Sequence, residues 1–324
     1  MVTHLDRFTR RERSFYPSLT ASACSLIISE SPFVDQAQTT SFQTVGIVGV
    51  GLIGGSIGIA LKKQKLAERV LGVGRSLANL EIAKTNGLID VITDLEQMAK
   101  VADLIIICVP VAQSKDVLKG IVPYLKKDAI IIDVGSTKMD VIQVAKEVLG
   151  DHMHQFIACH PIAGGAQHGA SAARDDLLEN KQVIMCPLFE NLMSDVTRIE
   201  HLWKDLGARV YKISALEHDH IFAAVSHLPH LLSYALMLQV ANAQDADKKF
   251  VHAGAGFRDF TRIAASSPEM WTDISLANRD ALLKELDGYL LIVEQMKKAI
   301  QSGDAKLLQK MFQIASDSRK DWQG

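Results

Sequence analysis

Residues 45–58 read Val-Gly-Ile-Val-Gly-Val-Gly-Leu-Ile-Gly-Gly-Ser-Ile-Gly, and this stretch decides the fold. Its first six residues predict a buried strand, and the glycines that follow match the spacing G-x-G-x-x-G at the start of a predicted helix. In this context Gly49 permits a tight turn, Gly51 lets the backbone approach a pyrophosphate, and Gly54 allows close packing of helix on strand. The expected cofactor-binding residues of this loop are Gly49, Gly51, Leu52, Ile53 and Gly54.

Short apolar runs and helix-like segments alternate along the chain as far as Ser214. Segments 114–125 and 139–149 are expected to be helices, and the β-branched runs between such segments are expected to be strands. Continuous apolar strands are typical of a parallel sheet that helices cover on both faces. The expected strands after the first lie at 70–73, 104–109, 130–134, 156–158 and 183–185.

After Ser214 the strand pattern stops, and only helical periodicity remains. The fold class is therefore expected to be α/β. An N-terminal Rossmann-type doubly wound parallel sheet should occupy 44–214, and a C-terminal all-α domain 215–324. The expected helices of the second domain include 216–240, 281–300 and 305–314.

The helix expected at 281–300 carries more apolar side chains than one core-facing stripe needs. Leu283 and Leu291 flank its main apolar row. Such a surplus predicts burial against another subunit, and a twofold homodimer is the commonest arrangement.

The first 43 residues look unlike the rest of the chain. They carry four arginines and many Ser and Thr residues, without sustained periodicity. Four acidic residues balance the arginines, which argues against an organelle transit peptide. We expect a flexible N-terminal extension, or a start codon placed too far upstream.

The composition excludes several classes of protein. A chain of 324 residues with 48% hydrophobic content can bury the cores of two domains, so it is not mostly disordered. The 35 Lys and Arg residues nearly balance 37 Asp and Glu, so no nucleic-acid partner is expected. No apolar run reaches the length of a membrane span, so no membrane partner is expected either. Four scattered cysteines fit a reducing, cytoplasmic compartment.

The end of the second expected strand indicates which dinucleotide binds. NAD enzymes usually keep an acidic residue there for the ribose 2′-hydroxyl, whereas this strand ends in Gly74-Arg75-Ser76. An arginine beside a hydroxyl can pair with a 2′-phosphate, so NADP is favoured over NAD. Two alternatives stay open: Arg75 is only a solvated surface residue, or it stacks on the adenine of either cofactor. Val109, at the end of its apolar run, is also expected at the cofactor.

Two further motifs follow later strands, at the edge of the sheet where ligands bind in open α/β folds. Residues 133–138 read Asp-Val-Gly-Ser-Thr-Lys, and residues 159–164 read Cys-His-Pro-Ile-Ala-Gly. His160 is expected just past its strand, opposite the glycine loop. A histidine there is well suited to acid–base work, because its pKa lies near the operating pH.

Four histidines crowd the helix expected at 216–240. His220, His227 and His230 are expected on one face, whereas His218 is not. Spacings of seven and three lack the i, i+4 pair of helical zinc sites, and no cysteine is near, so no metal is expected. A proline two residues after His227 is expected to kink the helix and to turn His227 towards the cleft.

Taken together, the chain resembles the prephenate/arogenate dehydrogenase family of tyrosine biosynthesis. The resemblance runs from Val45 onward and implies a nicotinamide cofactor, a prephenate or arogenate substrate, and a C-terminal helical domain that forms a dimer. It rests on five motifs in the right order: VGIVGVGLIGGSIG at 45–58, DVGSTK at 133–138, HPIAGG at 160–165, SHLPH at 226–230 and GFRDFTRIAASSPEMW at 256–271.

The resemblance also implies roles for individual residues. Ser136 would lie between the nicotinamide and the ring hydroxyl of the substrate, and His160 would take the proton of that hydroxyl. Arg262 would bind the ring carboxylate, because its planar fork suits a carboxylate. His227 and Trp271 would line the rest of the pocket. Loss of hydride and carbon dioxide would then make the ring aromatic.

One position departs from the family pattern. Many relatives carry an acidic residue two places beyond the glycine of the His-Pro-x-Ala-Gly motif, and here that position is Ala166. An acid there could act on the side-chain end of the substrate or on inhibitor binding. The choice between prephenate and arogenate, and feedback by tyrosine, therefore stay open.

Two other functions are the alternatives. A β-hydroxyacid or imine reductase shares the two-domain plan, although the β-hydroxyacid type needs a lysine that the stretch 216–240 lacks. A nucleotide-sensing module without turnover is the second alternative. Such a sensor would not need Ser136, His160 and Arg262 as a polar set opposite the nicotinamide.

Overall fold

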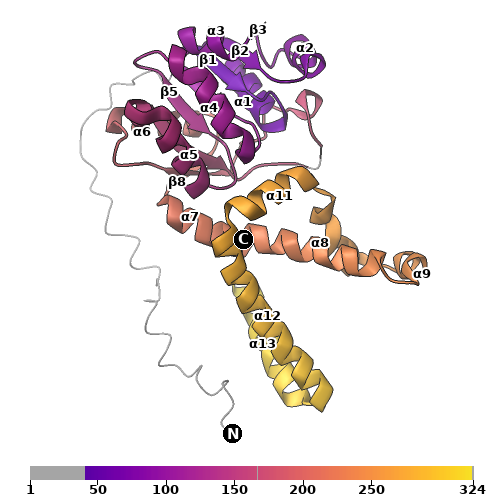
Figure 1. Cartoon of the computed structure of the whole chain (residues 1–324). Helices are drawn as coiled ribbons and strands as arrows, with labels where there is room; N and C mark the ends of the chain where they lie inside the picture. Colours follow the sequence, from indigo (N-terminus) through magenta and orange to yellow (C-terminus); the bar gives the residue numbers. More distant parts are fainter. Residues whose placement is uncertain (1–40, 166, 323–324) are drawn as a thin grey trace. The chain divides into compact units, whose positions relative to one another are not determined.

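The computed structural model describes residues 41–165 and 167–322, so the expected extension lies outside the described residues up to position 40. Its centre is one sheet of eight strands, ordered β3-β2-β1-β4-β5-β6-β7-β8 (Figure 1). All neighbouring strands are parallel except β6 and β7, which are antiparallel. The strands are β1 (Phe42–Val48), β2 (Ala67–Val73), β3 (Val91–Ile92), β4 (Leu104–Ile107), β5 (Ile130–Asp133), β6 (Phe156–Pro161), β7 (Gln182–Cys186) and β8 (Arg209–Lys212).

Helices cover both faces of this sheet. The first layer is α1 (Leu52–Lys63), α2 (Leu77–Thr85) and α6 (Met193–Asp205), and the second is α3 (Leu95–Val101), α4 (Ser114–Ile121) and α5 (Met139–Leu149). Along β4, Leu104 and Ile106 pack towards the first layer, whereas Ile105 and Ile107 pack towards the second. Both faces of the central strands are therefore apolar, and the prediction of a doubly wound Rossmann-type sheet is confirmed.

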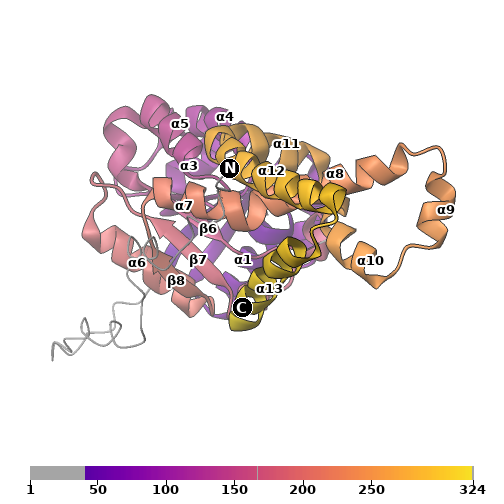
Figure 2. The same ribbon diagram turned by 90° about the horizontal axis from the view of Figure 1, so that it is seen from below.

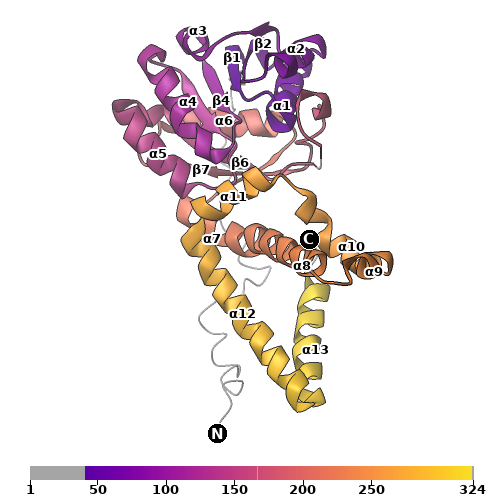
Figure 3. The ribbon, with the colours of Figure 1, turned by 45° about the vertical axis from the view of Figure 1, so that its right-hand side comes forward.

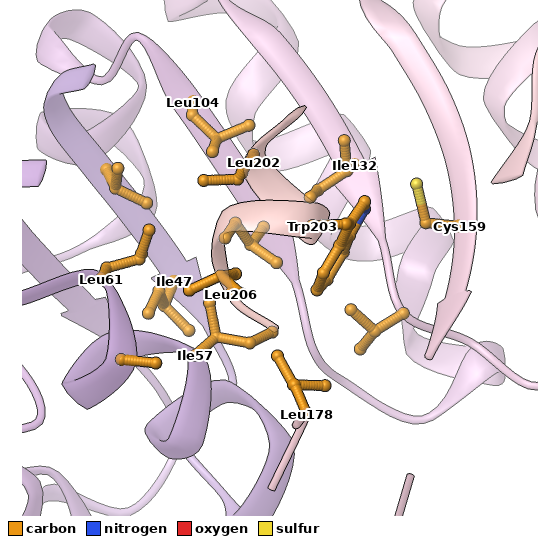
Figure 4. Packing of buried hydrophobic residues seen from close by; sticks show 14 of the residues in the cluster. Ile47, Ile57, Leu61, Leu104, Ile132, Cys159, Leu178, Leu202, Trp203 and Leu206 are labelled. Atoms are coloured by element: carbon orange, nitrogen blue, oxygen red, sulfur yellow. The ribbon is translucent and has the colours of Figure 1, made fainter. Parts of the chain in front are cut away.

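The first layer of the core anchors the two strands that lead into the candidate site. Trp203 and Leu202 of α6 pack with Ile132 of β5 and Cys159 of β6 in one buried cluster (Figure 4). β5 leads into the loop of Ser136, and Cys159 directly precedes His160. The packing of α6 therefore fixes the backbone on which both motifs sit.

Several strands differ from expectation. β1 starts at Phe42, so residues 42 and 43 of the expected extension belong to the sheet, and β4 ends at Ile107, two residues before the end of its apolar run. β3 has two residues, and β8 consists mostly of exposed residues, so neither forms an apolar run. β6 continues to Pro161, because it pairs with β7 along its whole second half. His160 therefore lies within a strand, and its expected place just past the strand is wrong.

The part of the chain after β8 is helical. α12 and α13 form a hairpin, which turns at Gly303 in the left-handed conformation with φ of 66° (Figure 3). α9 and α10 lie at the end of α8 that is far from α7 (Figure 2). The helices are α7 (Ala215–Phe222), α8 (Leu228–Ala241), α9 (Ala246–Val251), α10 (Ala255–Thr261), α11 (Pro268–Ala277), α12 (Arg279–Ser302) and α13 (Ala305–Asp321).

A π-helical turn at Ala223–His227 joins α7 to α8. It precedes Pro229, which lacks the amide proton that a regular helix would use. Such a turn contains one more residue than an α-helical turn, so it shifts the register of everything that follows. His218 and His227 are both buried, whereas His220 is exposed. The expected common face of His220, His227 and His230 is therefore wrong at His220.

Within the described residues, the continuous helical segment Ala215–Ala241 is the one stretch long and apolar enough to cross a membrane by length and composition. Its polar side chains are tied into the α/β domain, because His218 contacts His160 and Asp219 accepts hydrogen bonds at the start of α5. We interpret the segment as a helix of the folded chain that joins the two parts of the fold.

Candidate active site

The candidate site lies at the carboxyl ends of the parallel strands, where they meet the helical region. The glycine-rich loop follows β1, beside the point between β1 and β4 at which the strand order reverses. α11 lies against the turn Val111–Gln113 after β4, and α7 lies against α5 and β7. The helical residues therefore face the sheet edge at which dinucleotides bind.

The glycine-rich loop has the shape of a dinucleotide cradle. Gly49 has a φ of 93°, and a Cβ there would lie 2.5 Å from the Cys108 carbonyl oxygen. A Cβ at Gly54 would collide with the Gly49 carbonyl oxygen, whereas a Cβ at Gly51 would meet nothing within 4 Å. α1 starts at Leu52 with no capping side chain and no acidic residue in its first turn. Open space beside free helix amides fits a pyrophosphate.

The other residues expected along this loop have different positions. The Val109 side chain borders Gly49, since its Cγ1 would lie 3.1 Å from a Cβ at that glycine. Leu52 faces Gly165 of the β6–β7 connection. Ile53 packs against the core cluster beneath the loop. Val109 and Leu52 thus border the cradle, while Ile53 contributes mainly to packing.

The ribose edge, residues 74–76, is exposed at the end of β2. The Ser76 hydroxyl caps α2 by accepting a hydrogen bond from the Asn79 amide at 3.3 Å. The Asn79 side chain donates to the Val50 carbonyl at 2.7 Å, so α2 is tied to the glycine loop. In the part of the chain that the structure describes, Arg75 has no ion-pair partner. Its guanidinium can therefore meet a ligand.

His160 projects a buried imidazole from β6. Its Nδ1 lies 2.8 Å from Nε2 of His218, and its ring centroid lies 5.0 Å from that of Phe222. Burial lowers the pKa of His160 well below its usual value, and the nearby His218, Lys138 and His227 act in the same direction. His160 is therefore neutral at neutral pH, which is the state in which it can accept a proton.

A carboxylate stands behind these two histidines. Nδ1 of His218 lies 2.8 Å from Oδ1 of Asp219, and the same carboxylate accepts the backbone amides of Lys138 and Met139, each at 2.9 Å. Burial alone would raise the pKa of Asp219, but these hydrogen bonds outweigh burial and lower it. Asp219 is thus ionised at the end of a buried chain that begins at His160.

A fully buried ion pair holds the two motif strands together. The ammonium of Lys138 pairs with the Asp133 carboxylate and donates to the Cys159 carbonyl at 2.8 Å. Asp133 also accepts the Cys159 amide at 3.1 Å. The pair therefore fixes the loop that carries Ser136 against the backbone of His160.

A second group of polar side chains lies on the π-helical turn, on α8 and α11, and on the residue between α11 and α12. Nδ1 of His227 lies 3.1 Å from the amide of Asn278, which donates to the Asp219 carbonyl at 2.7 Å. The His230 ring stacks on Trp271 with centroids 3.5 Å apart. Buried atoms His227 Nε2, His230 Nδ1 and Trp271 Nε1 have no hydrogen-bond partner among the described residues. Each of these three atoms is free to form a hydrogen bond with a polar ligand.

The pKa shifts of these histidines locate two more predicted residues. Burial lowers the pKa of His227 to about 4, and the Ser136 backbone acts weakly in the opposite direction. Burial also lowers the pKa of His230 to about 4, and the charge of Arg262 adds to this fall. Ser136 therefore lies near His227, and Arg262 lies near His230.

The expected substrate and catalytic residues come together in one neighbourhood: Ser136, His160, His227, Arg262 and Trp271. Ala166 lies outside the described residues. The roles expected for these residues stay predictions. The described residues contain no group of three or more His, Cys, Asp or Glu side chains that could hold a metal ion.

Sequence analysis missed three residues of the site: His218, Asp219 and Asn278. A signal for the first two is present, since they form a His-Asp pair at the start of a long helix that is mostly apolar from Ile221 onward. Such a pair is costly to bury unless it is hydrogen-bonded, which marks it as a candidate for a network. Asn278 gives no comparable signal, because it follows a helix end where asparagine is common.

Comparisons with known proteins address the same two parts of the chain. A family model described as "Prephenate dehydrogenase, nucleotide-binding domain" matches residues 57–212. A second one, described as "Prephenate dehydrogenase, dimerization domain", matches residues 214–314.

Individual relatives match almost the whole described chain. The cyclohexadienyl dehydrogenase of Zymomonas mobilis is 34% identical over 283 residues, which is 86% of this chain and 96% of that protein. The crystal structure of Aquifex aeolicus prephenate dehydrogenase with hydroxyphenyl propionate and NAD+ has a TM-score of 0.81 at 30% identity, over 87% of this chain and 98% of that chain. The structure of Synechocystis arogenate dehydrogenase has a TM-score of 0.73 at 28% identity, over 86% and 99%.

Proposed function

The chain belongs to the prephenate dehydrogenase family, and we propose that it oxidises prephenate or arogenate with loss of carbon dioxide. The observation that carries the proposal is the neutral, buried imidazole of His160 beside a cluster of unsatisfied polar atoms. A reaction that removes a hydroxyl proton from a carboxylate substrate needs a neutral base to accept the proton and polar groups to bind the substrate. Family membership does not favour the reductase and sensor alternatives.

Each part of the site has a role in this reaction. Gly51 and the free amides of α1 would hold the dinucleotide pyrophosphate, and when bound the oxidised nicotinamide accepts a hydride from the substrate ring. Arg262 would bind the ring carboxylate through its planar fork. His160 would take the hydroxyl proton as the ring becomes aromatic, and Ser136 would help to orient that hydroxyl.

For the cofactor, we infer a preference for NADP over NAD. The support is the ribose edge, where the guanidinium of Arg75, unpaired among the described residues, and the hydroxyl of Ser76 lie exposed. The carboxylate that would repel a 2′-phosphate and accept from a free 2′-hydroxyl is absent from residues 74–76. NAD+ is the cofactor named for the Aquifex aeolicus structure, so the preference proposed here differs from the cofactor in that structure.

The assembly proposed is a homodimer through the helical part. Leu290, Leu291, Ile292 and Val293 are all exposed on α12, although four consecutive residues point to nearly every side of a helix. Phe312 and Ile314 of α13 are exposed as well. Only 28% of the most apolar window of Ala215–Ala241 is buried. A second copy would cover this apolar surface.

Light scattering tests the assembly directly. The expected mass is about twice the 35.5 kDa of one chain. L291E places a charge on the apolar surface of α12 and should reduce the measured mass towards that of a single chain. A monomer mass for the wild type at micromolar concentration would contradict the dimer. The cytoplasmic location stays a prediction from the scattered cysteines.

Cofactor reduction with three substrates tests the reaction. The wild type is incubated with NADP or NAD and with prephenate, arogenate or 3-hydroxyisobutyrate, and the absorbance of the reduced nicotinamide is followed. Turnover with prephenate or arogenate supports the proposal, and the ratio of the two rates assigns the substrate. Turnover with 3-hydroxyisobutyrate alone would overturn it in favour of the reductase, and dinucleotide binding without any turnover would favour the sensor.

A further inference from the structure

We propose that Asp219, acting through His218, fixes the proton of His160 on Nδ1 and so leaves Nε2 as the atom that accepts a proton from the substrate. His160 touches the reacting atoms in this scheme, and the other two are positioning residues. The part played by the substrate rests on the proposed function. The position of the proton on His160 does not, because it follows from the geometry of the free protein.

The first step in the argument is the state of Asp219. Its carboxylate receives three donors: the backbone N–H groups of Lys138 and Met139, and Nδ1 of His218. Backbone amides can only donate, so they favour the ionised carboxylate, which can only accept. The contact of 2.8 Å with His218 therefore requires the proton to sit on Nδ1 of that imidazole.

The second step passes this assignment to His160. A neutral His218 with its proton on Nδ1 has a lone pair on Nε2, which can only accept. That atom lies 2.8 Å from Nδ1 of His160, so the His160 Nδ1–H group donates to it. Nε2 of neutral His160 then carries no proton. The opposite tautomer of His160 would place two lone pairs against each other in a buried contact.

The third step concerns the charge that forms during reaction. When the O–H bond of the substrate breaks, its proton forms an N–H bond at Nε2 of His160 and leaves an imidazolium. The Nδ1–H group of that cation still donates to His218, and the negative charge of Asp219 lies one imidazole away. The carboxylate thus stabilises the cation without being protonated itself, as a buried carboxylate does behind the histidine of a hydrolase triad.

Asp219 also connects the proton acceptor to the rest of the site. Its carboxylate receives the amide of Lys138 from the loop of Ser136, and its carbonyl receives the side chain of Asn278, which contacts His227. One residue of α7 therefore aligns groups from β6, from the β5–α5 loop and from the junction of α11 and α12.

The test reads the tautomer itself by ¹⁵N NMR of histidine side chains in the substrate-free wild type. The His160 signal is assigned as the one that disappears in H160Q. The expected result is a His160 ring with the proton on Nδ1 and a bare Nε2. A wild-type His160 that carries its proton on Nε2 overturns the proposal, whatever the activity of the protein.

Two variants probe the connection, with a matched control. H218F removes the acceptor of the His160 proton but leaves the amide bonds to Asp219 in place. It should shift the His160 tautomer and lower kcat about 10- to 100-fold, with little change in KM. D219N should lower kcat further, because an amide offers one acceptor oxygen to three donors. H220Q changes an exposed histidine of the same helix and should behave as the wild type.

The outcomes of this experiment separate from those of the proposed function. Dinucleotide binding and circular dichroism show whether each variant is folded. A folded H218F with wild-type kcat and tautomer would overturn the connection. If the wild type oxidises neither prephenate nor arogenate, the proposed function fails while the tautomer measurement still decides this inference. If H218F does not fold, the wild-type spectrum decides it alone.

Discussion

The buried polar network around Asp219 and the exposed ribose edge at 74–76 are two parts of one candidate site, and the chain fixes them to very different degrees. In the network, the hydrogen bonds join residues of β6, α7, the β5–α5 loop and the junction of α11 and α12. At the ribose edge, the Ser76 hydroxyl accepts one hydrogen bond within its own helix, and Arg75 forms no ion pair with any residue that the structure describes. A substitution in the network should therefore disturb several elements at once, whereas a substitution at the ribose edge should affect only its own surroundings. The groups proposed for catalysis are thus held by the fold itself, whereas the proposed cofactor preference depends on a few exposed side chains.

The largest expected effect is the loss of the proton acceptor at the centre of the network. H160N should lower kcat by about 10²–10⁴, the usual contribution of a general base, with a modest change in KM. Steady-state kinetics measure both values. H220N, at an exposed histidine, is the matched control and should leave kcat unchanged. Near-normal turnover in H160N would remove His160 from the mechanism.

The next effect concerns stability. K138M leaves the buried Asp133 carboxylate without its cation and should lower the free energy of unfolding by about 3–5 kcal/mol. Denaturant unfolding measures the change. The control is K115M, which breaks an exposed pair with Glu147 and should cost less than about 1 kcal/mol. Equal losses in the two variants would mean that burial does not set the two regions apart.

Arg262 lies between the two extremes, because its side chain is exposed although it lies near the buried His230. R262A should raise the KM of the substrate about 10- to 100-fold, since a charged hydrogen bond contributes about 1.5–3 kcal/mol. Cofactor affinity should stay normal. R279A, at an exposed arginine paired with Asp280, is the control. Equal weakening of cofactor and substrate binding would indicate a general defect instead.

The smallest effect is expected at the ribose edge. A Cβ at Gly74 would make only ordinary contact with Leu80, so an aspartate fits there without strain. G74D combined with R75A should shift the ratio of kcat/KM from NADP towards NAD by about 1–3 kcal/mol, or roughly 5- to 150-fold. The stability of the variant should match that of the wild type. A wild type that uses NAD at least as well as NADP would refute the NADP preference.

The same contrast explains what the sequence could predict. Continuous apolar runs and the glycine spacing at 45–58 predicted the central strands and the dinucleotide loop, since both signals are local. The edge strands β3 and β8 have no such signal. The hydrogen-bond network could not be predicted, because its bonds join residues far apart in the chain. Lys138 and Asp219, for example, are 81 positions apart. The π-helical turn could not be predicted either, because no local sequence pattern marks one extra residue in a helix.

That extra residue has an evolutionary consequence. Deleting one residue, for example Ala224, would remove the extra residue of the π-helical turn between α7 and α8. It would also rotate α8 by about 100° relative to α7, and His227 and His230 would lose their places beside Asn278 and Trp271. The length of this segment is therefore set by the site and not by the helix. Single-residue insertions and deletions, which surface loops accept, should be forbidden here even where every substitution is tolerated.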